Sequence, residues 1–149
     1  MMKTVIVMQG ISGAGKTLYV TSYYPEAVVV SANNYFTDTF QNYRFDRRFI
    51  QHSHNQCLSH FNSALEHGKE LVIVDNTNTT IDEIEAYAKL ALEAAGYRVE
   101  VHTILEDPEV AHARNIHSVP LHAVMNQHQK LESSLKHMRQ SWHHSFVCV

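Results

Sequence analysis

An eight-residue segment near the N-terminus constrains the fold more than any other part of this sequence. Residues Gly10 to Thr17 read G-I-S-G-A-G-K-T and match the pattern G-x-x-x-x-G-K-[ST] in full. The β-branched run Thr4 to Met8 precedes this segment, and Leu18 to Tyr23 can continue it as a helix. Between a buried strand and a helix, such a segment presents its backbone N–H groups to phosphate. The sequence therefore favours a phosphate-binding loop over a glycine-rich turn without a ligand.

The residue types within this loop have separate chemical roles. The glycines permit the backbone conformations that a loop wrapped around phosphate requires. Loop N–H groups and the helix N-terminus supply partial positive charge, Lys16 would reach the β- and γ-phosphates, and Thr17 would hold Mg²⁺. We expect the nucleotide to contact Gly10, Ser12, Gly13, Ala14, Gly15, Lys16, Thr17 and Leu18.

The composition is that of an ordinary soluble globular protein. The chain has 149 residues, 44% of them hydrophobic, which suits a single domain with its own core. No apolar run reaches transmembrane length, and Cys57 and Cys148 are too few for a disulfide framework. The N-terminus runs directly into the loop, so we interpret it as a first strand and the protein as cytoplasmic. The net charge of −3 argues against an overall basic nucleic-acid surface, although not against a local groove.

Twelve histidines are an excess for a chain of this length. They show no zinc-finger spacing with cysteine and no H-E-x-x-H motif, so structural or surface roles are favoured over metal binding. In the segment H-S-H-N-Q-C, we expect His54 and Cys57 to pack on the inner face of a helix rather than to act as a nucleophile pair. Trp142 is expected to fill the edge of the core rather than to stack on a base.

Strand and helix patterns alternate along the chain. Short apolar runs predict buried strands over residues 4–8, 27–31, 71–74 and 98–105, with a last edge strand over 146–149. Helices are expected over 49–65, over 82–95, after the cap Asp107 and from near Pro120. Their inner faces should carry Phe49, Ile50, Cys57, Leu58, Phe61, Leu65, Ile84, Tyr87, Ala88, Ala91, Leu92, Leu121, Val124, Met125, His128, Leu131 and Leu135. This order predicts a three-layer α/β fold with a mainly parallel sheet of four to five strands.

Two polar segments follow predicted strands and should therefore lie at the same edge of the sheet as the loop. Asp75, followed by N-T-N-T-T, is a candidate to hold Mg²⁺ or its water; alternatively, it fixes the turn together with Asn76 and Asn78. The second segment, S-A-N-N-Y-F, places Asn33 where a kinase of this topology would accept the proton of the substrate hydroxyl. An amide can orient a hydroxyl, but it cannot take up a proton.

Two further segments contain arginines that are candidates for phosphate contacts. The segment R-F-D-R-R, Arg44 to Arg48, either contacts substrate phosphates or is a solvated helix start capped by Asp46. Arg114 follows the fourth strand and is a candidate lid residue that neutralises charge on the transferred phosphoryl group. The alternative is a surface salt bridge with Glu109 or Asp107.

Taken together, four motifs resemble the polynucleotide-kinase-like branch of phosphate-loop kinases over nearly the whole chain. These motifs are G-I-S-G-A-G-K-T, S-A-N-N-Y-F, D-N-T-N-T-T and R-N-I-H-S-V-P. The resemblance implies a three-layer P-loop NTPase fold, ATP and Mg²⁺ as ligands of Lys16 and Thr17, and Arg114 as the residue that stabilises the transition state. It also implies a polynucleotide 5′-end, a nucleoside or a small molecule as the phosphoryl acceptor.

One position departs from the family pattern. The family usually has an aspartate as general base in the second motif, and this chain has Asn33. Two hypotheses follow: an ATP-dependent kinase with Lys16, Asn33 and Arg114 as catalytic residues, or a nucleotide-binding or ATPase module with weak or lost kinase activity. A histidine-rich metal protein is a third and less favoured hypothesis.

Overall fold

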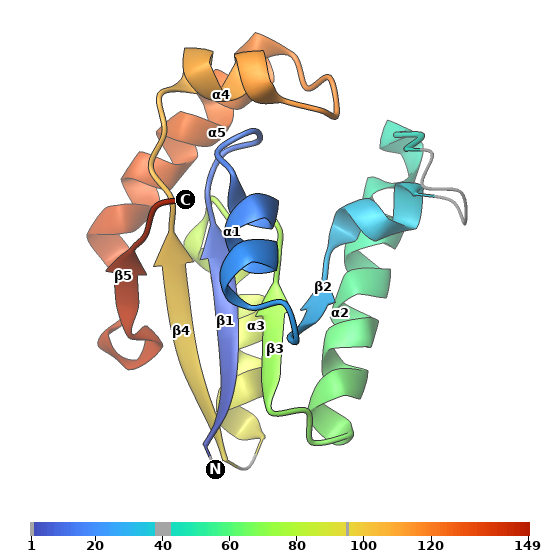
Figure 1. Ribbon diagram of the computed structural model, residues 1–149, viewed down its shortest axis with the longest axis vertical. Helices are drawn as coiled ribbons and strands as arrows, with labels where there is room; N and C mark the ends of the chain where they lie inside the picture. The colour runs from blue at the N-terminus through green and yellow to red at the C-terminus, as the bar shows by residue number, and fades with distance from the viewer. Residues whose placement is uncertain (1, 38–42, 95) are drawn as a thin grey trace.

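A five-stranded parallel sheet forms the centre of the molecule (Figure 1). The structure is a computed structural model that describes residues 2–37, 43–94 and 96–149. The strands are β1 (Lys3–Gln9), β2 (Val28–Val30), β3 (Leu71–Val74), β4 (Tyr97–Thr103) and β5 (His144–Phe146), in the order β2-β3-β1-β4-β5. The predicted three-layer α/β fold with a parallel sheet is confirmed.

The central strand β1 connects both halves of the sheet and leads directly into the phosphate-loop motif. It pairs with β3 on one side, where Val7 lies opposite Val74, and with β4 on the other over its full length. Val5, Ile6, Val7 and Met8 of β1 are all buried, since helices cover both faces of the sheet. This burial explains why β1 is apolar without alternation.

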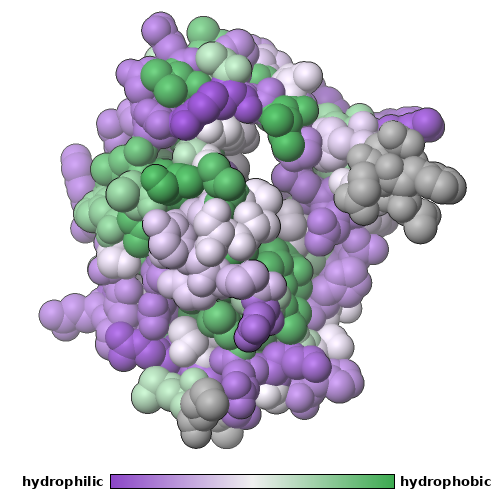
Figure 2. Space-filling view, in the orientation of Figure 1, coloured by the Kyte–Doolittle hydropathy of each residue, from purple (hydrophilic) through white to green (hydrophobic). Residues whose placement is uncertain are grey.

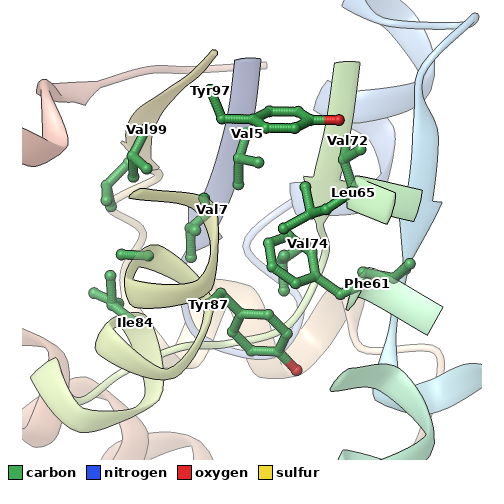
Figure 3. Packing of buried hydrophobic residues seen from close by; sticks show 14 of the residues in the cluster. Val5, Val7, Phe61, Leu65, Val72, Val74, Ile84, Tyr87, Tyr97 and Val99 are labelled. Carbon is green, nitrogen blue, oxygen red and sulfur yellow. The ribbon is translucent and has the colours of Figure 1, made fainter. Parts of the chain in front are cut away.

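Helices α2 (Ile50–Glu66) and α3 (Ile81–Glu93) cover one face of the sheet (Figure 3). Val5 and Val7 of β1 pack there with Val72 and Val74 of β3, and Phe61 and Tyr87 meet edge to face at 5.1 Å. Trp142, in a 3₁₀ turn before β5, belongs to the same cluster and is 1% exposed, which confirms its predicted place at the edge of the core.

The opposite face is covered by α1 (Lys16–Tyr23), α4 (Pro108–Arg114) and α5 (Leu121–Ser134). Ile6 and Met8 point to this side, since side chains alternate along a strand. Their neighbours in this second core include Val20 of α1, Ala111 of α4 and Leu131 of α5. The phosphate-loop motif is therefore held between the sheet and the α4–α5 pair.

Local sequence signals place several helix starts correctly. Asp107 accepts hydrogen bonds from the N–H groups of Glu109 and Val110, with Pro108 in the first turn of α4. Thr80 caps α3 by accepting from the N–H of Glu83. Such caps satisfy N–H groups that have no partner within the helix.

Some expectations for individual elements were wrong. The last strand lies at 144–146 rather than 146–149, because His143 adopts a left-handed conformation (φ 45°) after the buried Trp142 and returns the chain to β4. The segment S-A-N-N-Y-F forms a 3₁₀ turn, η1 (Ala32–Phe36), and a second turn, η2 (Arg47–Phe49), precedes α2.

Other corrections concern which side chains face the core. Phe49 and Ile50 are exposed, because they lie before and within the first turn of α2, where Phe49 neighbours Tyr35 of η1 at 6.3 Å instead of the sheet. Exposed too are Leu92 near the end of α3, and Leu121 and Met125 in the first turns of α5. His54 is exposed, whereas Cys57 one turn later is buried as expected.

Within the described residues, no helix combines the length and the apolar character needed to cross a membrane. The phosphate-loop motif, the ends of β2 and β3, and the loop after α4 all lie at the same end of the molecule (Figure 1). This arrangement follows from the parallel sheet, because the carboxyl ends of its strands share one edge.

Candidate functional site

The loop between β1 and α1 has the conformation that its glycines permit. Gly13 (φ 85°) and Gly15 (φ 102°) lie in the left-handed region, which L-residues with a side chain rarely adopt. Lys16 is the first residue of α1, and its Nζ donates a hydrogen bond to the carbonyl of Ile11, 3.0 Å away. The lysine side chain therefore bends back over the loop, toward the space that the loop surrounds.

Helices α4 and α5 hold the outer side of this loop. A Cβ atom on Gly13 would lie 2.0 Å from the carbonyl oxygen of Ala111 in α4, so only glycine fits at this contact. The backbone N–H of Ser12 donates to Oε1 of Gln127 in α5 at 2.8 Å. The loop is therefore positioned by two helices more than ninety residues away in the sequence.

The environment of Lys16 shifts its ionisation. Burial lowers the pKa of the Lys16 ammonium to about 8, and the nearby carboxylate of Asp75 opposes this shift. The ammonium is therefore poorly solvated in the free protein. An anionic ligand in contact with it would restore the charged form, because an opposite charge favours ionisation.

The side chains of Thr17 and Asp75 form a hydrogen bond beside the phosphate loop. The Oγ1 atom of Thr17 donates to Oδ2 of Asp75 at 2.7 Å. Asp75 follows the last residue of β3 and is 7% exposed, and its backbone N–H donates to the carbonyl of Val30. Hydroxyl and carboxylate oxygens are the hard ligands that Mg²⁺ prefers, so this pair fits the ion chemically.

The two asparagines after Asp75 shape the turn at the end of β3. Asn76 accepts through Oδ1 from the N–H of Ala32 at 2.8 Å, which links this turn to the start of η1. Asn78 has a φ of 45° and donates through Nδ2 to the carbonyl of Met8 at 2.7 Å. Both side chains therefore fix the backbone around Asp75 and leave its carboxylate directed at Thr17.

Asn33 lies in η1, at the carboxyl end of β2. Its backbone N–H donates to Oγ of Ser31, which caps this turn. The residue is exposed and lines the same pocket as Lys16 and Asp75. The structure thus places Asn33 in the pocket, and its role toward a substrate hydroxyl stays a prediction.

Arg114 is the last residue of α4 and faces the same pocket. It forms an ion pair with Glu106, and its side chain is 51% exposed. The salt-bridge alternative named Glu109 or Asp107 as partners, and this was wrong because Asp107 uses its carboxylate to cap α4. Exposed ion pairs contribute only about 0–1 kcal/mol, so Arg114 can exchange Glu106 for another anion at little cost.

These elements enclose a pocket of about 380 Å³. The predicted site residues that line it are Ser12, Gly13, Gly15, Lys16, Thr17, Leu18, Asn33, Asp75 and Arg114. Gly10 and Ala14 do not line it, since Ala14 is 2% exposed and packs in the core between the loop and α5. The space-filling view shows the pocket region as a hollow below the top of the molecule (Figure 2).

Sequence reasoning missed several lining residues, most of them in the loop after α4. The additional residues are Asn76, Thr77, Asn115, Ile116 and His117. Asn115 and His117 are part of the motif R-N-I-H-S-V-P, which carries the family resemblance and in which the sequence predicts a role only for Arg114. The motif itself was therefore the signal that could have found them.

The loop 115–120 reaches across the pocket to an arm that follows β2. This arm comprises residues 31–37 and 43–49 of the described chain. The rings of His117 and Tyr43 have centroids only 4.0 Å apart, so the loop and the arm meet above the pocket. Burial lowers the pKa of His117, the positive charge of Lys16 lowers it further, and Asp75 opposes this.

The outer surface of the arm combines cations and aromatic rings. Asp46 caps η2 and pairs with Arg48 at 2.7 Å, as the solvated-start interpretation expected. Arg44 and Arg47 remain exposed beside it. The aromatic side chains with substantial exposure here are Tyr35, Phe45 and Phe49.

A metal centre built from histidines has no support in this structure. Over residues 2–37, 43–94 and 96–149, no three side chains of His, Cys, Asp or Glu gather closely enough to hold an ion. His102 and His144 instead lie in a partly buried hydrogen-bonding region with Tyr19, Glu100 and Thr103.

Comparisons with known proteins agree with this geometry. The profile of a family described as an AAA domain matches residues 5–137. Among solved structures, the chain resembles a protein of the Pnkp1/Rnl/Hen1 RNA repair complex, with a TM-score of 0.73 and 11% identity over 93% of this chain and 47% of that one. It also resembles a gluconokinase from Sinorhizobium meliloti 1021, with a TM-score of 0.55 and 15% identity over 99% of this chain and 83% of that one. The chain thus spans about half the length of the repair-complex protein.

Proposed function

The chain belongs to the AAA domain family and has a P-loop kinase-like fold, and from this premise we propose that it is an ATP-dependent kinase that transfers the γ-phosphoryl group of ATP to a hydroxyl group. The observation that carries this proposal is the composition of one pocket. Lys16, Thr17 and Asp75 line it together with Asn33 and the loop after α4. A pocket that combines candidate phosphate-binding residues with further polar side chains suits transfer between two ligands.

The residues on the phosphate side have complementary tasks. Loop N–H groups and Lys16 bind the phosphate oxygens of ATP. Thr17 and Asp75 are the residues that would hold Mg²⁺, whose chemistry there is to neutralise charge between the β- and γ-phosphates. Arg114 leaves Glu106 and pairs with the γ-phosphoryl group as negative charge redistributes in the transition state.

The acceptor side favours the 5′-hydroxyl end of a single-stranded polynucleotide over a nucleoside or a small molecule. The arm presents the exposed cations Arg44 and Arg47 together with the exposed rings of Phe45 and Phe49. Cations that pair with phosphates and rings that stack on bases are the usual elements of single-strand binding. Asn33, at the base of this arm, orients the hydroxyl group.

The proposal also includes the cellular location of the protein and its domain organisation. We place the protein in the cytoplasm, where ATP is available and where Cys57 and Cys148 stay reduced, as both are free thiols in the structure. We also treat residues 1–149 as one domain, since a single sheet carries both cores.

The alternative is a nucleotide-binding or ATPase module, and Asn33 is the observation that favours it. An amide at the place of a general base removes a contribution of roughly 10²–10⁴ in rate. In phosphoryl transfer, however, positioning and electrostatics supply most of the catalysis. A module without an acceptor would bind ATP, and any phosphate that it released would not depend on added polynucleotide.

The test is an acceptor panel with γ-labelled ATP and Mg²⁺. The acceptors are 5′-hydroxyl DNA, 5′-hydroxyl RNA, a nucleoside mixture and gluconate, and Lys16→Met is the inactive control. We expect label on an oligonucleotide with the wild type and none with Lys16→Met. Tight ATP binding without transfer to any of these acceptors would overturn the kinase proposal in favour of the module.

A further inference from the structure

The proposed kinase site contains no general base at Asn33, so the proton of the acceptor hydroxyl must leave by another route. An asparagine amide is neutral and cannot bind a proton in the relevant pH range. Catalysis by proton acceptance needs a titratable group within hydrogen-bonding reach of the acceptor. Among the residues that line the pocket, His117 is the one whose ordinary pKa is close to neutral.

The loop that carries His117 contains two buried polar atoms without hydrogen-bond partners in the described structure. Nδ1 of His117 and Nδ2 of Asn115 have no hydrogen-bond partner among the described residues, and each is inaccessible to solvent. Buried groups without partners cost about 1–3 kcal/mol, and native structures retain few of them. Both side chains line the pocket that also contains Lys16 and Asp75. The loop 115–120 therefore retains unsatisfied hydrogen-bonding groups beside the pocket.

The second observation is the position of the His117 ring in the pocket. His117 lines the same pocket as Lys16 and Asp75. Its ring lies 4.0 Å, centroid to centroid, from Tyr43 on the arm that we assign to the acceptor. An acceptor hydroxyl must reach the γ-phosphoryl group from the side opposite the leaving ADP. His117 thus shares the pocket with Lys16 and contacts the arm that we assign to the acceptor.

The backbone and neighbouring contacts fix this placement. The N–H of His117 donates to Oδ1 of Asn115 at 2.8 Å, which closes a tight turn. Ser118, the next residue, has a φ of 56°, a conformation that costs energy for a residue with a side chain. Strained residues of this kind persist where the surrounding structure holds a functional group in place.

The charged groups around the ring favour its neutral form. Lys16 at the start of α1, Arg114 at the end of α4 and Asp75 after β3 line the same pocket as His117, and the ring of Tyr43 lies tilted against the imidazole. Burial and the charge of Lys16 lower the pKa of His117 below its ordinary 6.5, and Asp75 only partly offsets this. A neutral imidazole has one nitrogen free to accept a proton.

We propose that His117 is a catalytic residue that accepts the proton of the acceptor hydroxyl, in the place of the base that Asn33 cannot provide; this inference rests on the proposed kinase function. As the hydroxyl oxygen forms its bond to the γ-phosphorus, the bond between that phosphorus and the β–γ bridging oxygen breaks, and the electron pair leaves with ADP. The hydroxyl proton moves to the imidazole and then to solvent. Asn33 orients the hydroxyl without taking part in this transfer.

The test compares His117→Gln with the wild type in single-turnover phosphoryl transfer from ATP to the acceptor identified in the panel. We expect His117→Gln to slow transfer by about 10²–10³-fold, because general base catalysis contributes typically 10²–10⁴-fold. Its affinity for ATP should change little, which also verifies that the variant is folded. The matched control is His122→Gln, an exposed histidine of α5 outside the pocket, and we expect it to behave as the wild type.

The pH dependence of transfer separates a base from a merely structural side chain. The wild-type rate should rise with pH to a plateau as the imidazole loses its proton, and this rise should be absent in His117→Gln. Adding Asn33→Asp to His117→Gln should restore part of the transfer rate, because it supplies a carboxylate base at position 33.

Two results would overturn the proposal, and they differ from each other. If the wild type transfers phosphate while His117→Gln keeps both the wild-type rate and its rise with pH, His117 is not the base and the kinase function stands. If the wild type binds ATP but phosphorylates no acceptor, the kinase function fails and the role of His117 fails with it.

Discussion

At the scale of single residues, Lys16 gives the most direct electrostatic test of nucleotide binding. Its pKa in the free protein is lowered to about 8 by burial, and phosphate contact must raise it again. We predict that ATP binding between pH 8 and 9 takes up a proton, and that ATP affinity falls by up to about tenfold per pH unit above this pKa. Calorimetry in buffers of different ionisation enthalpy measures the uptake.

The control for this prediction is Lys16→Arg, whose guanidinium stays charged throughout this range. It should bind ATP without proton uptake. If the wild type binds ATP in this pH range without taking up a proton, this result would contradict a direct contact between Lys16 and the phosphates.

Asp75 allows the nucleotide and the metal to be separated. The carboxylate accepts a hydrogen bond from Thr17 and adds a negative charge near the phosphate side. We predict that Asp75→Asn weakens ATP binding in the presence of Mg²⁺ by about tenfold or more but leaves metal-free ATP binding equal or tighter, because the charge repels phosphate. Isothermal titration with and without EDTA tests this.

A matched control for this change is Asp82→Asn, which removes a carboxylate near the start of α3 and outside the nucleotide pocket. It should leave both affinities unchanged. Equal weakening of ATP binding by Asp75→Asn with and without Mg²⁺ would indicate a structural role for Asp75 in the turn after β3.

The residues that sequence could identify are those fixed by local geometry. Lys16 and Thr17 follow from one contiguous motif, and Asp75 follows because parallel strands end at a common edge. Gln127 depends on how α5 packs against the loop, and no local pattern encodes that packing. His117 belongs to the motif R-N-I-H-S-V-P, but its contact with Tyr43 depends on the fold. Arg114 was identified, but its partner Glu106 was not, because Asp107 is occupied in capping α4.

At the scale of elements, the contact between α4 and the phosphate loop is the tightest in the site. Gly13 has a φ of 85°, and an added Cβ would lie 2.0 Å from the carbonyl oxygen of Ala111. We predict that Gly13→Ala destabilises the protein by about 2–4 kcal/mol, because conformational strain and overpacking add. Denaturant unfolding measures this change.

Gly68 supplies the matched control for the steric part of this effect. It has a φ of 66°, and the nearest atom to an added Cβ is the flexible Nζ of Lys3, 3.8 Å away. Gly68→Ala should therefore cost only the conformational strain, about 1–2 kcal/mol. If both variants lose the same stability, α4 does not support the loop as the structure indicates.

The elements that sequence predicted well are those with a strong period or a clear cap. The strands β1 and β3 are continuous apolar runs, and α3 and α4 start at capping residues. The turn η1 has a capping residue, Ser31, but its five residues are too few to show a helical period. The position of β5 depends on the burial of Trp142 and the left-handed His143, which a short apolar run cannot reveal.

At the scale of the whole molecule, a polar cluster between β4 and α1 connects stability to pH. Tyr19 hydrogen-bonds to Nδ1 of His102 at 3.0 Å, and Nε2 of His102 contacts Glu100 at 2.8 Å. Burial would raise the pKa of Glu100, but the hydrogen bonds and charges of His102 and Arg98 outweigh it and lower the pKa. A carboxylate with a lowered pKa stabilises the fold above its unfolded-state pKa, and this stabilisation is lost as pH falls through the folded-state pKa.

We predict that Glu100→Gln reduces stability at pH 7 and that the difference from the wild type shrinks as pH falls below the ordinary glutamate value of 4.5. Urea midpoints measured from pH 7 to pH 3 provide the test. Glu66→Gln, an exposed carboxylate at the end of α2, is the control and should show no such convergence. A constant difference across this range would contradict the ionic role of Glu100.

The most direct test of the central claim, phosphoryl transfer to a hydroxyl acceptor in this pocket, is the product balance of a single turnover. Enzyme in excess over γ-labelled ATP, with Mg²⁺ and a 5′-hydroxyl oligonucleotide, should yield labelled oligonucleotide equal in amount to the ADP formed. Omission of the oligonucleotide should leave the ATP intact. Equal amounts of ADP and free phosphate, formed at the same rate with or without oligonucleotide, would instead identify an ATPase and contradict a kinase.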